Sequence, residues 1–128
     1  MRLLLDTHVA LWALVDDPRL GQPARGLIED AENRVFVSAA SLWEIAIKHA
    51  LGRGGVPFPA GDALRHFTEA GYESLAIRPS HAVVVETLPP IHADPFDRML
   101  VAQALTEPMR LLTHDRVLGK YSDVVLVV

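Results

Sequence analysis

Residues 1–8, with the sequence MRLLLDTH, begin the chain with an apolar run that ends at an acidic residue. Short apolar runs that stop at polar residues are typical of strands buried on both faces of a sheet. We therefore predict a strand over residues 1–5 with Asp6 at its carboxyl end. Because ligands of open parallel sheets bind beyond the carboxyl ends of the strands, this stretch also predicts where a site would lie.

Similar apolar runs alternate with helical patterns along the rest of the chain. Further strands are expected at residues 35–37, 75–77, 111–113 and 124–128. Helices are expected at residues 9–15, 19–31, 38–51, 60–70, 80–87 and 95–105. This alternation predicts an α/β fold, a three-layer α/β/α domain with a parallel sheet of about five short strands. With no repeat or linker visible, we interpret residues 1–128 as one domain.

The composition narrows the class of protein. The chain has no cysteine, which excludes disulfides, thiolate nucleophiles and thiolate-bound zinc. No apolar run approaches the roughly 20 residues of a membrane-spanning helix, and no secretory signal is visible, so we expect a cytoplasmic protein without a membrane partner. The net charge of −4 argues against nucleic-acid binding. Setting aside the four carboxylates discussed below leaves equal numbers of acidic and basic residues, which weakens that objection.

Asp6 and Asp115 each follow a predicted strand, Asp115 after Thr113 and His114. Both are therefore placed at the sheet edge where ligands bind. An Asp between a strand and a helix is also a favoured N-cap. Taken alone, each position favours the capping role over the functional one.

Glu44 and Asp97 are the other two acidic candidates. Glu44 lies in an apolar helical stretch at residues 41–48 (SLWEIAIK), where a buried carboxylate needs a partner. That partner is either Lys48, four residues on, or a metal ion, and Glu44 alone favours Lys48. Asp97 lies in residues 94–98 (DPFDR), an excellent helix start with Asp94 as the N-cap. Since Asp97 heads the core-facing stripe of this helix, we keep it as a site candidate.

The order of these motifs resembles the PIN-domain family, over nearly the whole chain. The matching segments are residues 3–8 (LLLDTH), 41–48 (SLWEIAIK), 94–104 (DPFDRMLVAQA) and 111–115 (LLTHD). Within the family, the Leu-Trp-Glu and Asp-Pro-Phe-Asp-Arg motifs are typical of VapC-like toxins of bacterial type II toxin–antitoxin (VapBC) systems. The resemblance implies a carboxylate pocket that holds Mg²⁺ or Mn²⁺ and endonucleolytic cleavage of RNA. It also implies a homodimer and inhibition by a VapB-like antitoxin.

Metal-assisted phosphodiester hydrolysis assigns a role to each candidate residue. One or two divalent cations neutralise phosphoryl charge and activate water, and oxygen ligands select hard ions such as Mg²⁺. We expect Asp6 and Asp97 to contact the metal, because both come from rigid element ends. The other expected site residues are Glu44 and Asp115, which complete the pocket, Thr113, which hydrogen-bonds a carboxylate or water, and Arg98 and Arg116, which contact RNA phosphate.

Two other functions are kept as alternatives. The first is an α/β phosphohydrolase with a strand-end Asp nucleophile, although the haloacid-dehalogenase-like pattern places a second Asp where this chain has His8. The second is a PIN-like RNA-binding module that does not cleave. The six histidines show no metal-ligand spacing and are interpreted as ordinary core or surface residues. Trp12 and Trp43 are interpreted as core or interface residues rather than base-stacking platforms.

Overall fold

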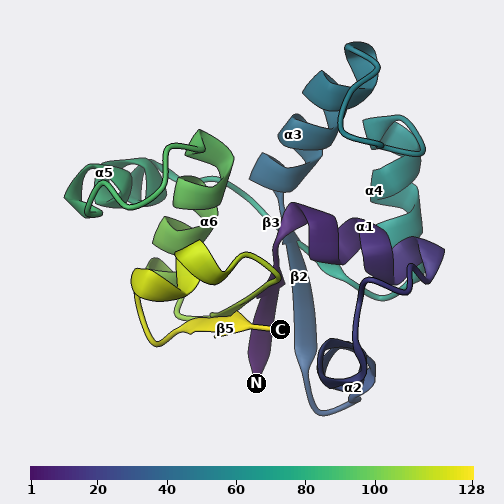
Figure 1. The fold of residues 1–128 in the computed structure, drawn as a ribbon, viewed down its shortest axis with the longest axis horizontal. Helices are drawn as coiled ribbons and strands as arrows, with labels where there is room; N and C mark the ends of the chain where they lie inside the picture. The colour runs from purple at the N-terminus through teal and green to yellow at the C-terminus, as the bar shows by residue number, and fades with distance from the viewer.

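The computed structural model describes residues 1–128 and contains one five-stranded parallel sheet (Figure 1). The strands are β1 (Arg2–Leu5), β2 (Arg34–Ser38), β3 (Glu73–Leu75), β4 (Arg110–Thr113) and β5 (Val125–Val127). Their order across the sheet is β3-β2-β1-β4-β5, and every neighbouring pair is parallel. The predicted α/β class and the parallel five-stranded sheet are confirmed.

Helices cover both faces of this sheet (Figure 1). They are α1 (Thr7–Val15), α2 (Gln22–Glu29), α3 (Ala39–Ala50), α4 (Ala60–Glu69), α5 (Pro79–Thr87), α6 (Pro95–Thr106) and the short 3₁₀ helix η1 (Arg116–Lys120). Helices α5, α6 and η1 lie on one side, and α1, α2 and α4 lie on the other. None of these helices is both long and apolar enough to cross a membrane.

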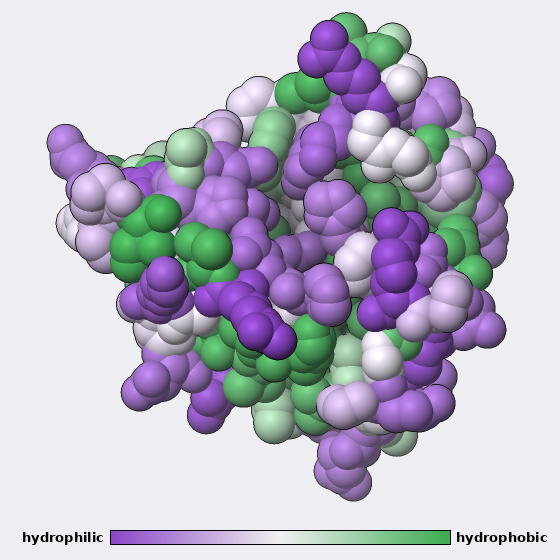
Figure 2. Space-filling view, in the orientation of Figure 1, coloured by the Kyte–Doolittle hydropathy of each residue, from purple (hydrophilic) through white to green (hydrophobic).

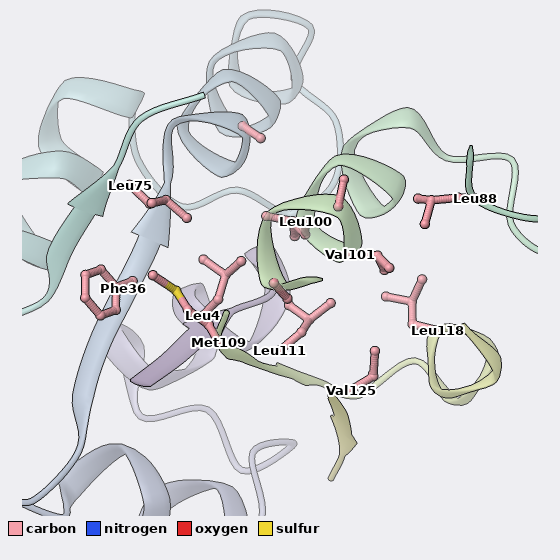
Figure 3. Close-up of a cluster of buried hydrophobic side chains, with 13 residues drawn as sticks. Leu4, Phe36, Leu75, Leu88, Leu100, Val101, Met109, Leu111, Leu118 and Val125 are labelled. Atoms are coloured by element: carbon pink, nitrogen blue, oxygen red, sulfur yellow. The ribbon is translucent and has the colours of Figure 1, made fainter. Parts of the chain in front are cut away.

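The core consists of two apolar clusters separated by the sheet. Side chains of successive strand residues point to opposite faces, so Leu4 and Leu111 pack beneath α6 whereas Leu5 and Leu112 pack beneath α1. Figure 3 shows the α6-side cluster, in which Leu100 also packs. All five of these leucines are fully buried. The uninterrupted leucine runs of β1 and β4 therefore reflect strands covered on both faces.

The sheet topology fixes where a site can form. From β1 the chain winds outward through β2 to β3, and it then returns to pair β4 with the other side of β1. The direction of winding thus reverses between β1 and β4. In doubly wound sheets the connecting segments diverge at such a point, which leaves a crevice at the carboxyl ends of the two strands. Asp6 follows β1 and Asp115 follows β4 at this position.

Most predicted elements differ from the observed ones by one or two residues at an end, and three differences have a clear physical reason. Strand β3 spans Glu73–Leu75 rather than residues 75–77, because it is an edge strand whose first two residues are exposed and carry no apolar signal. Helix α2 begins at Gln22 rather than residue 19, since Gly21 is its N-cap and Pro23 lies in its first turn. The short helix η1 was not predicted. It begins where Asp115 caps the backbone N–H of Val117.

Candidate active site

A polar cleft of about 430 Å³ lies at the carboxyl ends of β1 and β4. Its lining residues are Asp6, His8, Trp12, Arg19, His92, Asp97, His114 and Asp115. Figure 2 shows hydrophilic side chains gathered over this part of the molecule, between α6 and α1. Three of the four predicted acidic residues therefore meet in one cleft, although they come from three separate segments of the chain.

Asp6 has both of the roles that its sequence position allowed. One carboxylate oxygen, Oδ1, caps α1 by accepting hydrogen bonds from the backbone N–H groups of His8 (2.8 Å) and Val9 (3.4 Å). The other oxygen, Oδ2, accepts a hydrogen bond of 2.6 Å from the hydroxyl of Thr113. Asp6 is 5% exposed. Capping thus fixes the orientation of a carboxylate that also lines the cleft.

Thr113 links the first acidic residue to the last. Its hydroxyl donates to Asp6 and accepts a hydrogen bond of 3.1 Å from the backbone N–H of Asp115. Asp115 in turn caps η1 through Oδ1, which accepts from Val117 N–H at 2.9 Å. The buried Thr113 side chain therefore sets the relative positions of the carboxylates that follow β1 and β4.

Asp97 is the carboxylate without a hydrogen-bond partner. Its backbone N–H is held by the N-cap Asp94 (3.2 Å), but its carboxylate accepts no hydrogen bond from the protein, and the nearest donor, His92 Nε2, lies 3.5 Å from Oδ2. Burial raises the pKa of Asp97 to about 7, and the negative charges of Asp6, Asp94 and Glu44 add to this effect, whereas His92 opposes it. The cleft therefore contains a partly exposed acidic group, without a hydrogen bond from the protein, that a cation would stabilise.

Glu44 lies behind the cleft rather than in its lining. It is 3% exposed, and it accepts hydrogen bonds from the Thr7 hydroxyl (2.7 Å) and from Lys48 Nζ (2.6 Å). Burial opposes the charge of Lys48, but the bond to Glu44 and the nearby carboxylates, including Asp97, raise its pKa overall. The predicted alternative for Glu44, an ion pair with Lys48, is thus present. Its charge still acts on the cleft, because it contributes to the raised pKa of Asp97.

His92 joins the acidic cluster, although sequence reasoning assigned it no role. Its Nε2 lies 3.0 Å from Asp115 Oδ2 and 3.5 Å from Asp97 Oδ2. Its Nδ1 accepts a hydrogen bond of 3.0 Å from the backbone N–H of Asp94. Because Nδ1 is an acceptor, the ring proton lies on Nε2, which donates to Asp115. In this arrangement His92 is a hydrogen-bond donor to the carboxylates rather than a metal ligand.

Neither of the two arginines predicted to contact RNA, Arg98 and Arg116, lines the cleft. Both terminal nitrogens of Arg98 donate hydrogen bonds to acceptors outside the cleft. These acceptors are the backbone oxygens of Val85, Leu88 and Pro89 and the hydroxyl of Tyr121. Arg98 therefore fastens the end of α5 and the following loop to α6. Arg116 is exposed at the start of η1 and does not line the cleft. Arg19 is the arginine that lines the cleft, and its sequence position gave no signal for it.

The donor set of the cleft fits a hard divalent cation. Asp6, Asp97 and Asp115 offer carboxylate oxygens, which Mg²⁺ and Mn²⁺ prefer. One oxygen of Asp97 and one of Asp115 lie within 4.8 Å of each other, which is close enough for both to reach one ion. The unpartnered carboxylate of Asp97 is the feature that a bound cation would satisfy. The chain has no thiol that would favour a softer metal.

Comparisons with known proteins agree with this architecture. The family model of the PIN domain matches residues 3–124. Ribonuclease VapC22 of Mycobacterium tuberculosis is 34% identical over 115 residues, which are 89% of this chain and 87% of the relative. VapBC2 from Rickettsia felis, solved with a promoter DNA fragment, superimposes with a TM-score of 0.70 at 14% identity, covering 100% of this chain and 98% of the other.

A second solved structure, DNA-bound VapBC from Salmonella typhimurium, has a TM-score of 0.68 at 13% identity and covers 100% of this chain and 97% of its own. At these identities the two structures support the fold. The family model and the curated relative, each matching most of the chain, establish the family. The chain belongs to the PIN-domain family.

Proposed function

We propose that the cleft is the active site of a metal-dependent endoribonuclease, the toxin component of a VapBC toxin–antitoxin pair. One observation carries this proposal. Asp6, Asp97 and Asp115 converge from three segments of the chain on one cleft, and the carboxylate of Asp97 has no hydrogen-bond partner there. The name of the curated relative, a ribonuclease, supports the assignment.

Asp6, Asp97 and Asp115 would hold Mg²⁺ or Mn²⁺. When bound, the ion supplies neutralisation of the phosphoryl charge and activation of the attacking water. Asp6 is oriented by its capping bonds and by Thr113, so it presents a fixed oxygen to the ion. Asp115 is oriented by its hydrogen bonds from Val117 and His92, so it would present its carboxylate to the ion in a set position. Glu44 acts from behind the cleft by adding negative charge that favours a cation.

The hydrogen bonds of Asp6 disfavour the alternative of an aspartyl-phosphate enzyme. Oδ1 accepts two backbone N–H groups and Oδ2 accepts the Thr113 hydroxyl. Each of these bonds draws electron density from the oxygen that would have to attack phosphorus. Beside Asp6, the cleft presents His8 where such an enzyme would carry its second Asp. We therefore assign Asp6 to cation binding.

The test is incubation of the purified protein with total RNA and Mg²⁺ or Mn²⁺. An EDTA sample and the Asp6→Asn protein are the controls, and circular dichroism checks that the variant is folded. We expect discrete fragments that are absent from both controls. Fragments that persist with EDTA would contradict metal dependence. An absence of cleavage combined with an absence of Mn²⁺ binding would favour the non-cleaving RNA-binding module.

The partners and location follow from the same proposal. A VapB-like antitoxin is expected, because the structural neighbours are VapBC complexes. A homodimer and a cytoplasmic location remain predictions. Light scattering measures the mass of the purified chain alone, which tests the homodimer, and of the chain co-expressed with its antitoxin, which tests the complex. A strictly monomeric chain would contradict the homodimer.

A further inference from the structure

We infer, on the basis of the ribonuclease function proposed above, that Trp12 forms a stacking site for an unpaired RNA base beside the scissile phosphate. The site comprises Trp12, His8, Arg19 and His114, and we call it the Trp12 platform. Its residues come from α1, from the loop before α2 and from the loop after β4. All four also line the acidic cleft.

The platform is an ordered group of planar side chains. The guanidinium of Arg19 lies 4.9 Å from the centre of the Trp12 ring, and the His114 ring meets Trp12 edge-on at 5.3 Å. His8 approaches the same ring from one turn away, at 6.0 Å. Aromatic rings and arginine planes are the groups on which unpaired bases stack in proteins that bind single-stranded RNA.

Neighbouring bonds hold the platform in place. Arg19 donates to Asp17 from Nε (3.0 Å) and from a terminal nitrogen (2.8 Å), which fixes its plane over Trp12. His114 donates from Nδ1 to the backbone oxygen of Val128 at 2.8 Å. A surface ordered before the ligand arrives loses less entropy on binding. The platform is therefore ordered before a ligand arrives, with Trp12 packed at the edge of the α1-side core.

The cleft extends past Trp12, away from the carboxylates. A second hollow of about 290 Å³ shares His8, Trp12 and Arg19 with the acidic cleft and runs toward Gly54 and Gly55. A strand with its phosphate at the acidic end would thus pass over Trp12. Trp12 also packs against the apolar cluster on the α1 side of the sheet, as expected of a core residue, and the platform adds a role to that packing.

Charge favours a stacking contact at this place. The chain carries a net charge of −4, and Arg19 is the only lysine or arginine in the cleft lining. Attraction of phosphates by lysine and arginine is therefore weak here, and stacking on Trp12 supplies affinity that does not depend on it. Because paired bases are covered by their neighbours, the platform should select single strands over duplexes.

The two tryptophans of the chain allow a direct test, because each can be left as the sole emitter. Trp43→Phe leaves Trp12, and Trp12→Phe leaves Trp43, which is 60% exposed on α3 and lies outside the cleft. Both proteins keep all four carboxylates, and Ca²⁺, a hard cation that takes oxygen ligands, replaces the Mg²⁺ or Mn²⁺ that cleavage requires. A dye-labelled single-stranded oligo(A) 10-mer is titrated into each with Ca²⁺, following tryptophan emission and dye anisotropy together.

We expect the RNA to quench Trp12 emission and to leave Trp43 emission unchanged, with little effect from the same RNA as a duplex. Under the same Ca²⁺ conditions, Trp12→Ala should weaken binding roughly 5- to 150-fold, the range of one lost base stack, whereas Trp12→Phe should retain most of it. Trp43→Ala is the matched control and should bind as before.

Three results would overturn the inference, and they differ in whether the ribonuclease proposal also fails. Binding seen by anisotropy with unchanged Trp12 emission and no effect of Trp12→Ala would remove the platform and leave the ribonuclease proposal intact. Loss of antitoxin binding alone in Trp12→Ala would assign the platform to a protein partner. RNA that neither binds nor is cleaved by the unchanged chain would overturn both proposals.

Discussion

Two histidines in this molecule make the same pair of contacts in opposite surroundings. His81 and His92 each accept a backbone N–H at Nδ1 and each donate from Nε2 to a carboxylate. His81 is fully buried between α5 and α6 and serves one carboxylate, Glu107. His92 faces both Asp97 and Asp115 in an open cleft.

The surrounding polar groups explain the difference. Around His81 each polar group has a partner, since Ser38 donates to Gln103 (2.6 Å) and Gln103 donates to the backbone oxygen of Ala76 (3.3 Å). In the cleft, His92 Nε2 hydrogen-bonds Asp115 at 3.0 Å but lies 3.5 Å from Asp97, whose carboxylate accepts no hydrogen bond from the protein. Fully satisfied buried networks stabilise a unique structure, whereas unsatisfied ones cost stability. We conclude that the first region serves the fold and that the second is suited to a ligand.

The largest expected effect is on the rate of RNA cleavage, which should distinguish Asp97 in the cleft from Glu107 beside His81. Asp97→Asn should lower the cleavage rate by at least about 100-fold, because loss of a ligand exceeds the 10- to 100-fold typical of outer partners. Glu107→Gln keeps an acceptor for His81 and should cleave at the normal rate. Initial rates on a purified RNA target measure both. Equal cleavage rates for the two variants would contradict the assignment of the cleft to function and of the His81 region to the fold.

The next effect is on stability. His81→Ala removes a fully buried ring and leaves Glu107 without its donor, so it should lower the free energy of unfolding by about 2–4 kcal/mol. His92→Ala, in the open cleft, should cost less than about 1 kcal/mol. Urea unfolding of the metal-free proteins compares them. A larger loss for His92→Ala than for His81→Ala would reverse our assignment.

Thr113 tests how the carboxylates are oriented. Thr113→Val keeps the shape of the side chain but removes the hydroxyl that joins Asp6 to Asp115, so Mn²⁺ affinity should fall about 10- to 100-fold. Thr113→Ser keeps the hydroxyl and is the control, with near-normal affinity. If both variants bound Mn²⁺ like the unchanged chain, the hydroxyl would have no part in the site.

The smallest effect concerns pH. In the unfolded chain Asp97 ionises near its ordinary pKa of 3.8, whereas in the folded metal-free protein it keeps its proton up to about pH 7. The folded state therefore binds more protons in this window, so Asp97 makes the protein less stable as pH rises from about 4 to 7. Asp97→Asn should raise the metal-free stability at pH 8 by about 1–2 kcal/mol, less than the full shift implies because water reaches the cleft.

The same group makes metal binding depend on pH. Mn²⁺ competes with the proton on Asp97, so it should raise the Tm more at pH 8 than at pH 5.5. Thermal unfolding at both pH values, with and without Mn²⁺, measures this. A metal effect that is equal at both pH values in the unchanged chain would show that Asp97 does not take part.

Local sequence patterns predicted the fold where burial is strong. The leucine runs of β1 and β4 are buried on both faces, and their apolar signal marked them clearly. Strand β3 was misplaced by two residues because Glu73 and Ser74 lie on an exposed sheet edge, where backbone pairing with β2 decides the register. Pairing between distant segments leaves no local pattern to follow.

The candidate site was predicted only for residues that belong to a motif. Asp6, Asp97 and Asp115 were placed by strand ends and a helix start, which are local features. His92, Trp12 and Arg19 reach the cleft through the packing of separate segments, and nothing in their spacing indicates it. The role of Glu44 was left open between Lys48 and metal because the sequence could not show which face of α3 meets the cleft.

The most direct test of the central claim is a calorimetric titration of Mn²⁺ at pH 8. The unchanged chain, Asp97→Asn and Glu107→Gln are compared at equal concentration. We predict saturable binding to the unchanged chain and to Glu107→Gln, and no measurable binding to Asp97→Asn. If Asp97→Asn bound Mn²⁺ as tightly as the unchanged chain, the cleft formed by Asp6, Asp97 and Asp115 would not be the metal site.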